Sequence, residues 1–108
     1  MTRAVRKTLI GKWRIVEMEL WDTDYLDLVE PAYIRFERGG SGEFVFGVVT
    51  GGLDCDYTGE GVDFTWQGHN EMDEASGDGW AELEDNGNLT GEIKIHLSDE
   101  STFKARRW

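Results

Sequence analysis

The stretch that decides the fold is residues 80–95, which read WAELEDNGNLTGEIKI. Two runs of alternating apolar and polar residues flank the dipeptide Asn86-Gly87. Alternation with a period of two is typical of strands that bury one face, and an Asn-Gly pair favours a tight turn with positive φ at both central residues. Residues 80–84 and 88–95 are therefore predicted to form an antiparallel hairpin with a type I′ turn.

The same signals recur on both sides of this hairpin. Further strands are predicted at residues 11–20, 33–38, 43–50, 53–57, 62–67 and 102–107, with a break at Gly51-Gly52 and a long acidic loop over 68–79. The chain has 14 glycines and one proline, as expected of short strands joined by tight turns. About eight strands in sequence order form a meander, which hides its edges by closing. The predicted fold is mainly β: one antiparallel meander β-barrel domain spanning residues 1–108.

One short helix, of about two turns, is predicted between the first two strands. Asp22 is suited to cap its N-terminus, and Trp21 and Leu26 flank the cap as in a hydrophobic staple. Pro31 ends the helix. The face turned toward the interior is predicted to consist of Trp21, Tyr25, Leu28 and Val29.

The first strand carries apolar residues on both of its faces. Trp13 and Ile15 share one face, whereas the other holds Val16, Met18 and Leu20. A β-bulge near Ile15 would direct both sets inward. Without the bulge, Glu17 would point into an aromatic interior that raises its pKa, which would make it a candidate base. The sequence leaves both alternatives open.

The predicted core follows from the phase of the alternation. Buried positions are expected to include Trp13, Phe44, Phe46, Cys55, Phe64, Ile93, Ile95 and Phe103, and exposed ones Asp54, Asp56, Asp63 and Lys94. Trp80 is expected to face outward if its neighbours Ala81 and Leu83 face inward, and an exposed tryptophan would mark a contact surface.

Charge excludes some classes of partner. The formal net charge is −11, which disfavours nucleic acid. The positive charges gather near the two ends of the chain, at Arg3, Arg6, Lys7, Lys12, Arg14, Lys104, Arg106 and Arg107. Pairing of the first and last strands would gather them into one basic stripe on an acidic body.

The remaining chemistry points away from catalysis. Cys55 is the single cysteine, so no internal disulfide is possible. The sequence shows no signal peptide and no membrane span, and a cytoplasmic location is therefore expected. Asp22, Asp24 and Asp27 begin like a calcium loop but lack its glycine and its distal glutamate. The acidic residues of the predicted loop over 68–79 fit a solvated face. No catalytic residue, cofactor or metal site is predicted.

Two resemblances add to these patterns. Gly11-Lys12-Trp13, together with Arg106 or Arg107 near the end of the chain, resembles the calycin signature of lipocalins and fatty-acid-binding proteins. That resemblance implies a barrel whose tryptophan closes the floor beneath a stacked arginine, with the short helix as a lid. Separately, parts of residues 13–34 and 73–77 resemble a family of short, acidic, uncharacterised bacterial proteins, which implies a bacterial host and no particular activity.

Two functions are weighed on this basis. The first is a non-enzymatic, calycin-like binding protein for a small apolar or aromatic molecule held beneath the helix. Its expected ligand-binding residues are Trp21, Tyr25, Leu28, Tyr33, Trp66 and, without the bulge, Glu17. The alternative is a homo-oligomeric interaction module, expected to be a homodimer. Its aromatic surface and its basic stripe would contact acidic surface. A cavity of about 300 Å³ or more with a mouth near the helix would favour the first, and a filled core with a large apolar dimer contact the second.

Overall fold

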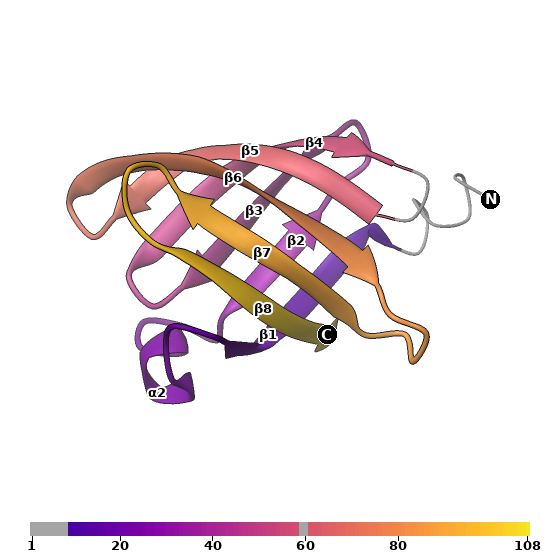
Figure 1. Ribbon diagram of the computed structural model, residues 1–108, viewed down its shortest axis with the longest axis horizontal. Helices are drawn as coiled ribbons and strands as arrows, with labels where there is room; N and C mark the ends of the chain where they lie inside the picture. Colours follow the sequence, from indigo (N-terminus) through magenta and orange to yellow (C-terminus); the bar gives the residue numbers. More distant parts are fainter. Residues whose placement is uncertain (1–8, 59–60) are drawn as a thin grey trace.

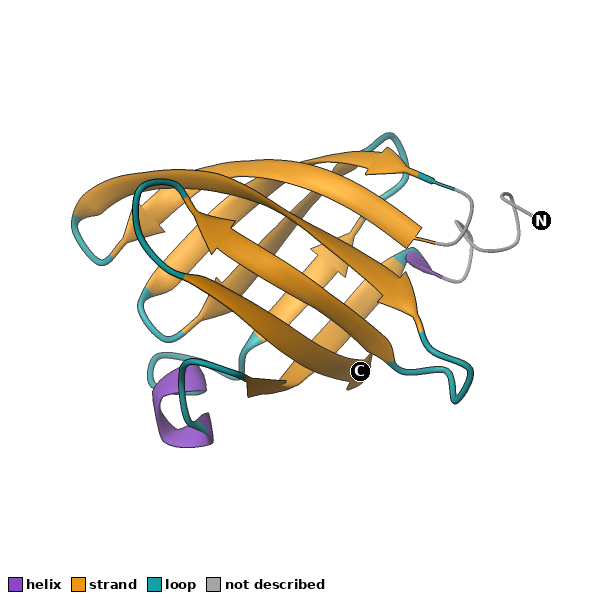
Figure 2. Ribbon diagram, viewed as in Figure 1, coloured by secondary structure: helices purple, strands orange, loops and turns teal. Residues whose placement is uncertain are grey.

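The chain runs up and down through eight antiparallel strands that close into a barrel in sequence order, as predicted (Figure 1). This computed structural model describes residues 9–58 and 61–108. Within them the strands are β1 (Gly11–Met18), β2 (Tyr33–Phe36), β3 (Ser41–Phe46), β4 (Val49–Tyr57), β5 (Gly61–Asn70), β6 (Asp73–Leu83), β7 (Leu89–Ile95) and β8 (Glu100–Arg107). The short helix α2 (Thr23–Leu26) joins β1 to β2 (Figure 2).

Alternate connections lie at the same end of a meander. The connection that contains α2 and the turns after β3, β5 and β7 share one end of the barrel, which we call the helix end (Figure 1). The turns after β2 and β6 and the C-terminus lie at the other end. The first and last strands pair, with Trp13 opposite Arg107 and Met18 opposite Phe103, so the barrel has no open edge between them.

Of the two alternatives for β1, the one with a bulge is present. The pairing of β1 with β8 shifts register between Ile15 and Glu17, which lets Ile15 and Met18 both face the core. Val16 is the extra residue and remains 39 % exposed, so the bulge does not bring it inside as predicted. Glu17 points outward and is exposed. The open alternative in which Glu17 is an interior base is therefore wrong.

The two adjacent glycines of β4 do not break the strand, contrary to prediction. β4 continues through Gly51 and Gly52, because the inward Gly51 leaves room for aromatic rings: a Cβ there would lie 2.8 Å from both Phe44 and Trp66. The chain reverses earlier, at Gly47, whose φ is +57°. The segment 43–50 is thus two strands and a turn, not one kinked strand.

The predicted acidic loop over 68–79 is also wrong. β5 and β6 stay paired from Gly61 opposite Glu82 to Asn70 opposite Asp73. Small and polar residues fill this hairpin, so it lacks the apolar alternation on which the prediction relied. Backbone pairing in an antiparallel sheet does not require that alternation.

The hairpin of residues 80–95 forms, but its turn is longer than predicted. Glu84 N–H donates to the Asn88 carbonyl at 2.8 Å and Gly87 N–H to the Glu84 carbonyl at 2.9 Å. Gly87 has a φ of +87°, whereas Asn86 does not have a positive φ. This is the pattern of a three-residue loop that ends in a glycine bulge, and the type I′ prediction is wrong.

Aromatic rings opposite glycines fill the barrel. A Cβ on Gly79 would lie 2.6 Å from Phe64 and one on Gly91 would lie 2.6 Å from Phe103, which repeats the arrangement at Gly51. No described side chain has a buried polar atom without a hydrogen-bond partner. The core prediction is confirmed for Trp13, Phe44, Phe46, Phe64, Ile93, Ile95 and Phe103, as is the exposure of Asp54, Asp56 and Asp63.

Two core predictions need correction, since Lys94 is only half-exposed and Cys55 only partly buried. Burial and then the nearby Asp54 carboxylate nevertheless raise the pKa of the Cys55 thiol from 9.0 to about 11. We expect native Cys55 to react with a thiol reagent at pH 8 about 100-fold more slowly than in the urea-unfolded chain, because thiolate is the reactive species. Equal labelling rates in the two states would contradict this prediction.

Candidate functional site

The helix end is capped by a single helical turn. Asp22 caps it as predicted, since its Oδ1 accepts from the Tyr25 N–H at 3.0 Å. The helix ends at Leu26, which is buried, so it has about half the predicted length. Leu28 lies outside the helix and is 63 % exposed, and its neighbour Val29 is also exposed. The prediction that these two residues face the interior is wrong.

An ion pair explains why the helix stops. The Arg14 guanidinium donates from Nη1 and Nη2 to both carboxylate oxygens of Asp27, at 2.8 and 2.6 Å. Asp27 Oδ1 also accepts from the Ala32 N–H at 3.0 Å. The Arg14 bond first, and then the Ala32 bond, lower the pKa of Asp27 from 3.8 to about 2. The connection is therefore tied to β1 directly after the first turn.

This ion pair predicts a specific acid sensitivity. The pKa of Asp27 is lower in the folded chain, so the pair contributes stability that is complete above about pH 4 and lost as pH falls through 2. The Asp27 side chain is 38 % exposed, so screening reduces the contribution to about 1 kcal/mol. In urea unfolding at successive pH values, the difference between wild type and Asp27→Asn should disappear near pH 2. Arg14→Gln should lose the same pH-dependent part and also a constant part, because Arg14 Nη1 donates to the Ala32 carbonyl at 3.0 Å. A difference between wild type and Asp27→Asn that persists at pH 2 would contradict this account.

Three of the six predicted ligand residues belong to one aromatic column. Trp21 packs on Tyr25 and Phe46 with ring centroids 5.9 and 5.2 Å apart. Phe46 stacks on Phe44 at 5.5 Å, and Phe44 meets Trp66 edge-on at 5.0 Å. Trp66 is only 2 % exposed and its Nε1–H donates to the Lys94 carbonyl, so it lies within the core and not at a mouth.

The structure separates the other three from this column. Leu28 and Glu17 face solvent. Tyr33 lies on the outer face of the barrel, where it is only 8 % exposed because Lys12 and Trp108 cover it. The Lys12 Nζ lies 4.3 Å from the Tyr33 ring centroid and 4.2 Å from that of Trp108. Burial, and then the hydrogen bond to Glu43, raise the pKa of Tyr33 to about 12.

At the opposite end of the barrel, an arginine stacks on a buried tryptophan. The Arg107 Cζ lies 4.0 Å from the Trp13 ring centroid, and its Nη1 donates to the Ile10 carbonyl at 3.0 Å. Trp13 Nε1–H donates to the Leu9 carbonyl at 3.0 Å. This is the contact that the calycin resemblance implies, made by Arg107 and not by Arg106. A cation on an indole face contributes about 0.5–2 kcal/mol.

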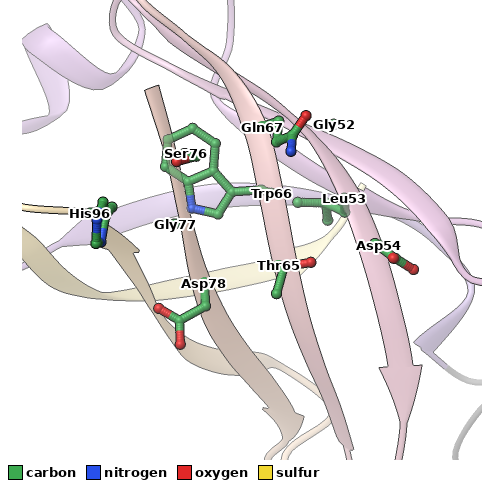
Figure 3. A pocket seen from close by; sticks show the side chains of 10 residues that line it. All are labelled: Gly52, Leu53, Asp54, Thr65, Trp66, Gln67, Ser76, Gly77, Asp78 and His96. Carbon is green, nitrogen blue, oxygen red and sulfur yellow. The ribbon is translucent and has the colours of Figure 1, made fainter. Parts of the chain in front are cut away.

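Several open hollows lie on the outer surface of the described chain, over β4, β5 and β6. Two cross-strand rows of outward side chains line one of them: Asp54, Thr65 and Asp78 in the first row, and Asp56, Asp63 and Trp80 in the second. We call these six residues the outer trough. The hollow over them measures about 450 Å³ and adjoins one of about 780 Å³ that reaches Gln67, Ser76 and His96 (Figure 3).

Negative charge predominates in the outer trough, which is bordered by the cation of Lys94 on β7, directly opposite Asp78. None of its four aspartates takes part in an ion pair or a side-chain hydrogen bond with another residue in the described part of the chain. Asp56 and Asp63 lie directly opposite each other on β4 and β5, an arrangement that destabilises a sheet. Trp80 is half-buried and donates from Nε1 to Glu92 at 3.3 Å. No group of three or more metal-ligating side chains is placed to hold an ion within residues 9–58 and 61–108.

A second charged surface lies on the far side of the barrel. Lys12, Arg14, Lys104 and Arg106 project from β1 and β8, and we call these four residues the basic stripe. Arg14 lies directly opposite Arg106, which is exposed and forms no ion pair with a described residue. Trp108, 53 % exposed, borders the stripe. The predicted members Arg3, Arg6 and Lys7 lie outside the described residues.

The outer trough was missed at the level of sequence. The alternation of β4 and β5 correctly directed three aspartates outward, and Trp80 faces outward as expected. Asp78 was assigned to a loop, so neither the first row nor the hollow could be assembled. The signal that could have found it is the Gly77-Asp78-Gly79 alternation, in which the two glycines sit beneath Trp66 and Phe64.

Known proteins add no assignment to this geometry. Comparison with protein-family models, with curated proteins and with solved structures found no match. Among the described helices, none combines the length and the apolar character that crossing a membrane requires.

Proposed function

We propose that this barrel is a non-enzymatic protein-interaction module that binds a basic protein surface in the outer trough. The observation that carries the proposal is the position of the hollow. It lies outside a barrel whose interior is filled by aromatic rings, and four carboxylates without partners line it. A filled core disfavours an interior ligand and so supports an interaction module.

The chemistry of the trough indicates the kind of partner. Unpaired carboxylates attract lysine and arginine side chains, and the net charge of −11 steers a basic partner from a distance. Trp80 adds a half-buried aromatic surface between them, and tryptophan is enriched where binding energy concentrates. Thr65 in the centre can both donate and accept hydrogen bonds. The trough thus offers charge, apolar contact and polar contact together.

A peptide titration tests this function. A fluorescently labelled, ten-residue peptide rich in Lys and Arg should bind the wild-type protein, and a Glu-rich peptide of equal length should not. Asp56→Asn/Asp63→Asn should weaken binding at least tenfold. The matched control Asp85→Asn/Asp99→Asn removes two exposed carboxylates from the turns after β6 and β7, and should bind like wild type. Equal weakening of peptide binding in both double variants would mean that only the net charge of the protein matters, and would reject the outer trough as the binding site.

A second candidate is the binding of a small apolar or aromatic molecule beneath α2. The observation that favours it is the Trp21–Tyr25 pair, which covers Phe46 from the helix end while remaining partly exposed. A shift of α2 would open the top of the aromatic column. Apolar ligands should then quench tryptophan fluorescence and raise the melting temperature, and Trp21→Ala should remove both effects. Unchanged fluorescence and melting across an apolar ligand series would reject this candidate.

The setting of the module is part of the proposal. The Arg107–Trp13 contact supports a calycin-like barrel. The single cysteine supports a reducing cytoplasm, and the resemblance to short acidic bacterial proteins supports a bacterial host.

A further inference from the structure

We propose that the basic surface bound in the outer trough is the basic stripe of a second copy of this chain, so that copies assemble head to tail. This inference rests on the proposed function of the trough and names its partner. Three features of the two surfaces support it: their positions, their charges and their aromatic residues.

The two surfaces lie on opposite sides of the barrel. In a closed ring of strands ordered β1 to β8, the pair β4–β5 is diametrically opposite the pair β8–β1. A contact between trough and stripe therefore joins two different surfaces. Each copy added in this way leaves one trough and one stripe free, so the contact produces an open chain and not a closed dimer.

Each surface contains a cross-strand pair of like charges, of opposite sign on the two sides. Asp56 faces Asp63 in the trough, and Arg14 faces Arg106 in the stripe. Like charges directly opposite each other are unfavourable within one barrel. Arg14 is already bonded to Asp27, so Arg106 is the main exposed cation of its pair. Contact between copies would bring Arg106 to the two aspartates and relieve the repulsion on both sides.

Each surface also carries a tryptophan beside its charges. Trp80 lies directly opposite Asp63 on the neighbouring strand. Trp108 lies 4.2 Å from the Lys12 Nζ and 5.8 Å from the Arg14 Cζ, measured from its ring centroid. Aromatic residues surrounded by a charged rim are typical of protein interfaces. The two tryptophans supply the apolar centre that the charges alone lack.

The net charge makes the salt dependence diagnostic. Two copies of charge −11 repel each other at long range, whereas the trough–stripe attraction acts at contact. Raising the ionic strength from about 0.01 M to 0.15 M shortens the screening length from roughly 30 to 8 Å, which removes the long-range repulsion first. Self-association should therefore rise over this range and fall toward 1 M. Binding of a basic peptide should only weaken as salt is added.

Sedimentation velocity of the full chain over a range of concentrations tests the proposal. The average mass of the wild type should rise with concentration without stopping at a dimer. Asp56→Asn/Asp63→Asn and Arg106→Gln should each weaken self-association at least tenfold. Their equimolar mixture should form a one-to-one dimer that does not grow, because only one trough and one stripe remain intact. The controls Asp85→Asn/Asp99→Asn and Arg38→Gln, which alter exposed residues elsewhere, should behave like wild type.

The outcomes separate this inference from the proposed function. A wild type that stays monomeric at all salt concentrations but binds the basic peptide overturns the second-copy partner and leaves the trough function intact. A discrete dimer that survives either variant overturns the head-to-tail contact. Failure of both self-association and peptide binding rejects the two proposals together. Melting curves exclude misfolding, because removal of a like-charge pair should not lower the melting temperature of the trough variant.

Discussion

Trp66→Ala should lower the free energy of unfolding by about 3–5 kcal/mol, because a fully buried tryptophan leaves a cavity that the surrounding residues cannot fill. The indole packs edge-on against Phe44, covers Gly77 and satisfies the Lys94 carbonyl through its Nε1–H. The substitution removes all three contacts. Urea unfolding monitored by circular dichroism measures the loss, since the remaining tryptophans would complicate fluorescence.

Trp80→Ala is the matched control for this experiment. Both tryptophans stand on neighbouring strands of one hairpin, but Trp80 faces the outer trough and is half-exposed. We expect it to cost about 1 kcal/mol, because a half-buried side chain gives up less apolar contact than a fully buried one. A similar loss of unfolding free energy in the two variants would contradict the structure, in which the core lies on the inner face of the barrel.

The second large effect is expected at two adjacent glycines. Gly51→Ala should destabilise the fold by about 1–3 kcal/mol, because its Cβ would lie 2.8 Å from the rings of both Phe44 and Trp66. Gly52→Ala should stabilise it by about 0.4–1 kcal/mol, because its Cβ would meet only the Gln67 carbonyl, at 3.8 Å, and alanine restricts the unfolded chain.

Opposite signs at neighbouring positions test the filled interior directly. Both glycines lie in β4 without a positive φ, so backbone strain does not distinguish them. If Gly51→Ala were neutral, there would be free space beneath Phe44, and the binding of a small molecule inside the barrel would become the better account.

The sequence was sufficient for the architecture because its local signals agree with one another. The alternation around Asn86-Gly87 predicted a hairpin, the Asp22 cap placed the helix, and the phase slip near Ile15 marked the position of the bulge as one of two alternatives. Each of these signals depends on neighbours in the chain, so no tertiary information was needed. Closure followed from the number of strands and their order.

The errors occur where a distant residue decides the local structure. The Gly51-Gly52 pair has the composition of a turn, but it lies within a strand. The rings of Phe44 and Trp66 occupy the space that a side chain at Gly51 would fill. Leu28 has the spacing of a helical face, yet the Arg14–Asp27 pair ends the helix before it. Neither partner can be identified from the segment itself. The same limit hid Asp78, and with it the first row of the trough.

The predicted ligand residues do not all lie together in the structure, for a related reason. The expected ligand residues were chosen for their aromatic character near the helix, and Trp21, Tyr25 and Trp66 do form one column with Phe44 and Phe46. A column of rings is, however, what fills a small barrel. Whether an aromatic residue lines a cavity or fills it depends on the volume that the glycines opposite leave, which only the structure shows.

The most direct test of the central claim is an NMR titration of the isotopically labelled wild-type protein with the Lys- and Arg-rich peptide. Binding at the outer trough predicts shifts concentrated at the backbone amides of Asp54, Asp56, Asp63, Thr65, Asp78 and Trp80 and at the Trp80 indole N–H. Signals from Trp21 and from the Trp66 indole N–H, which is bonded inside the core, should remain unchanged. Shifts centred on Trp21, Tyr25 and Trp66, or no shifts at the trough, would contradict the account.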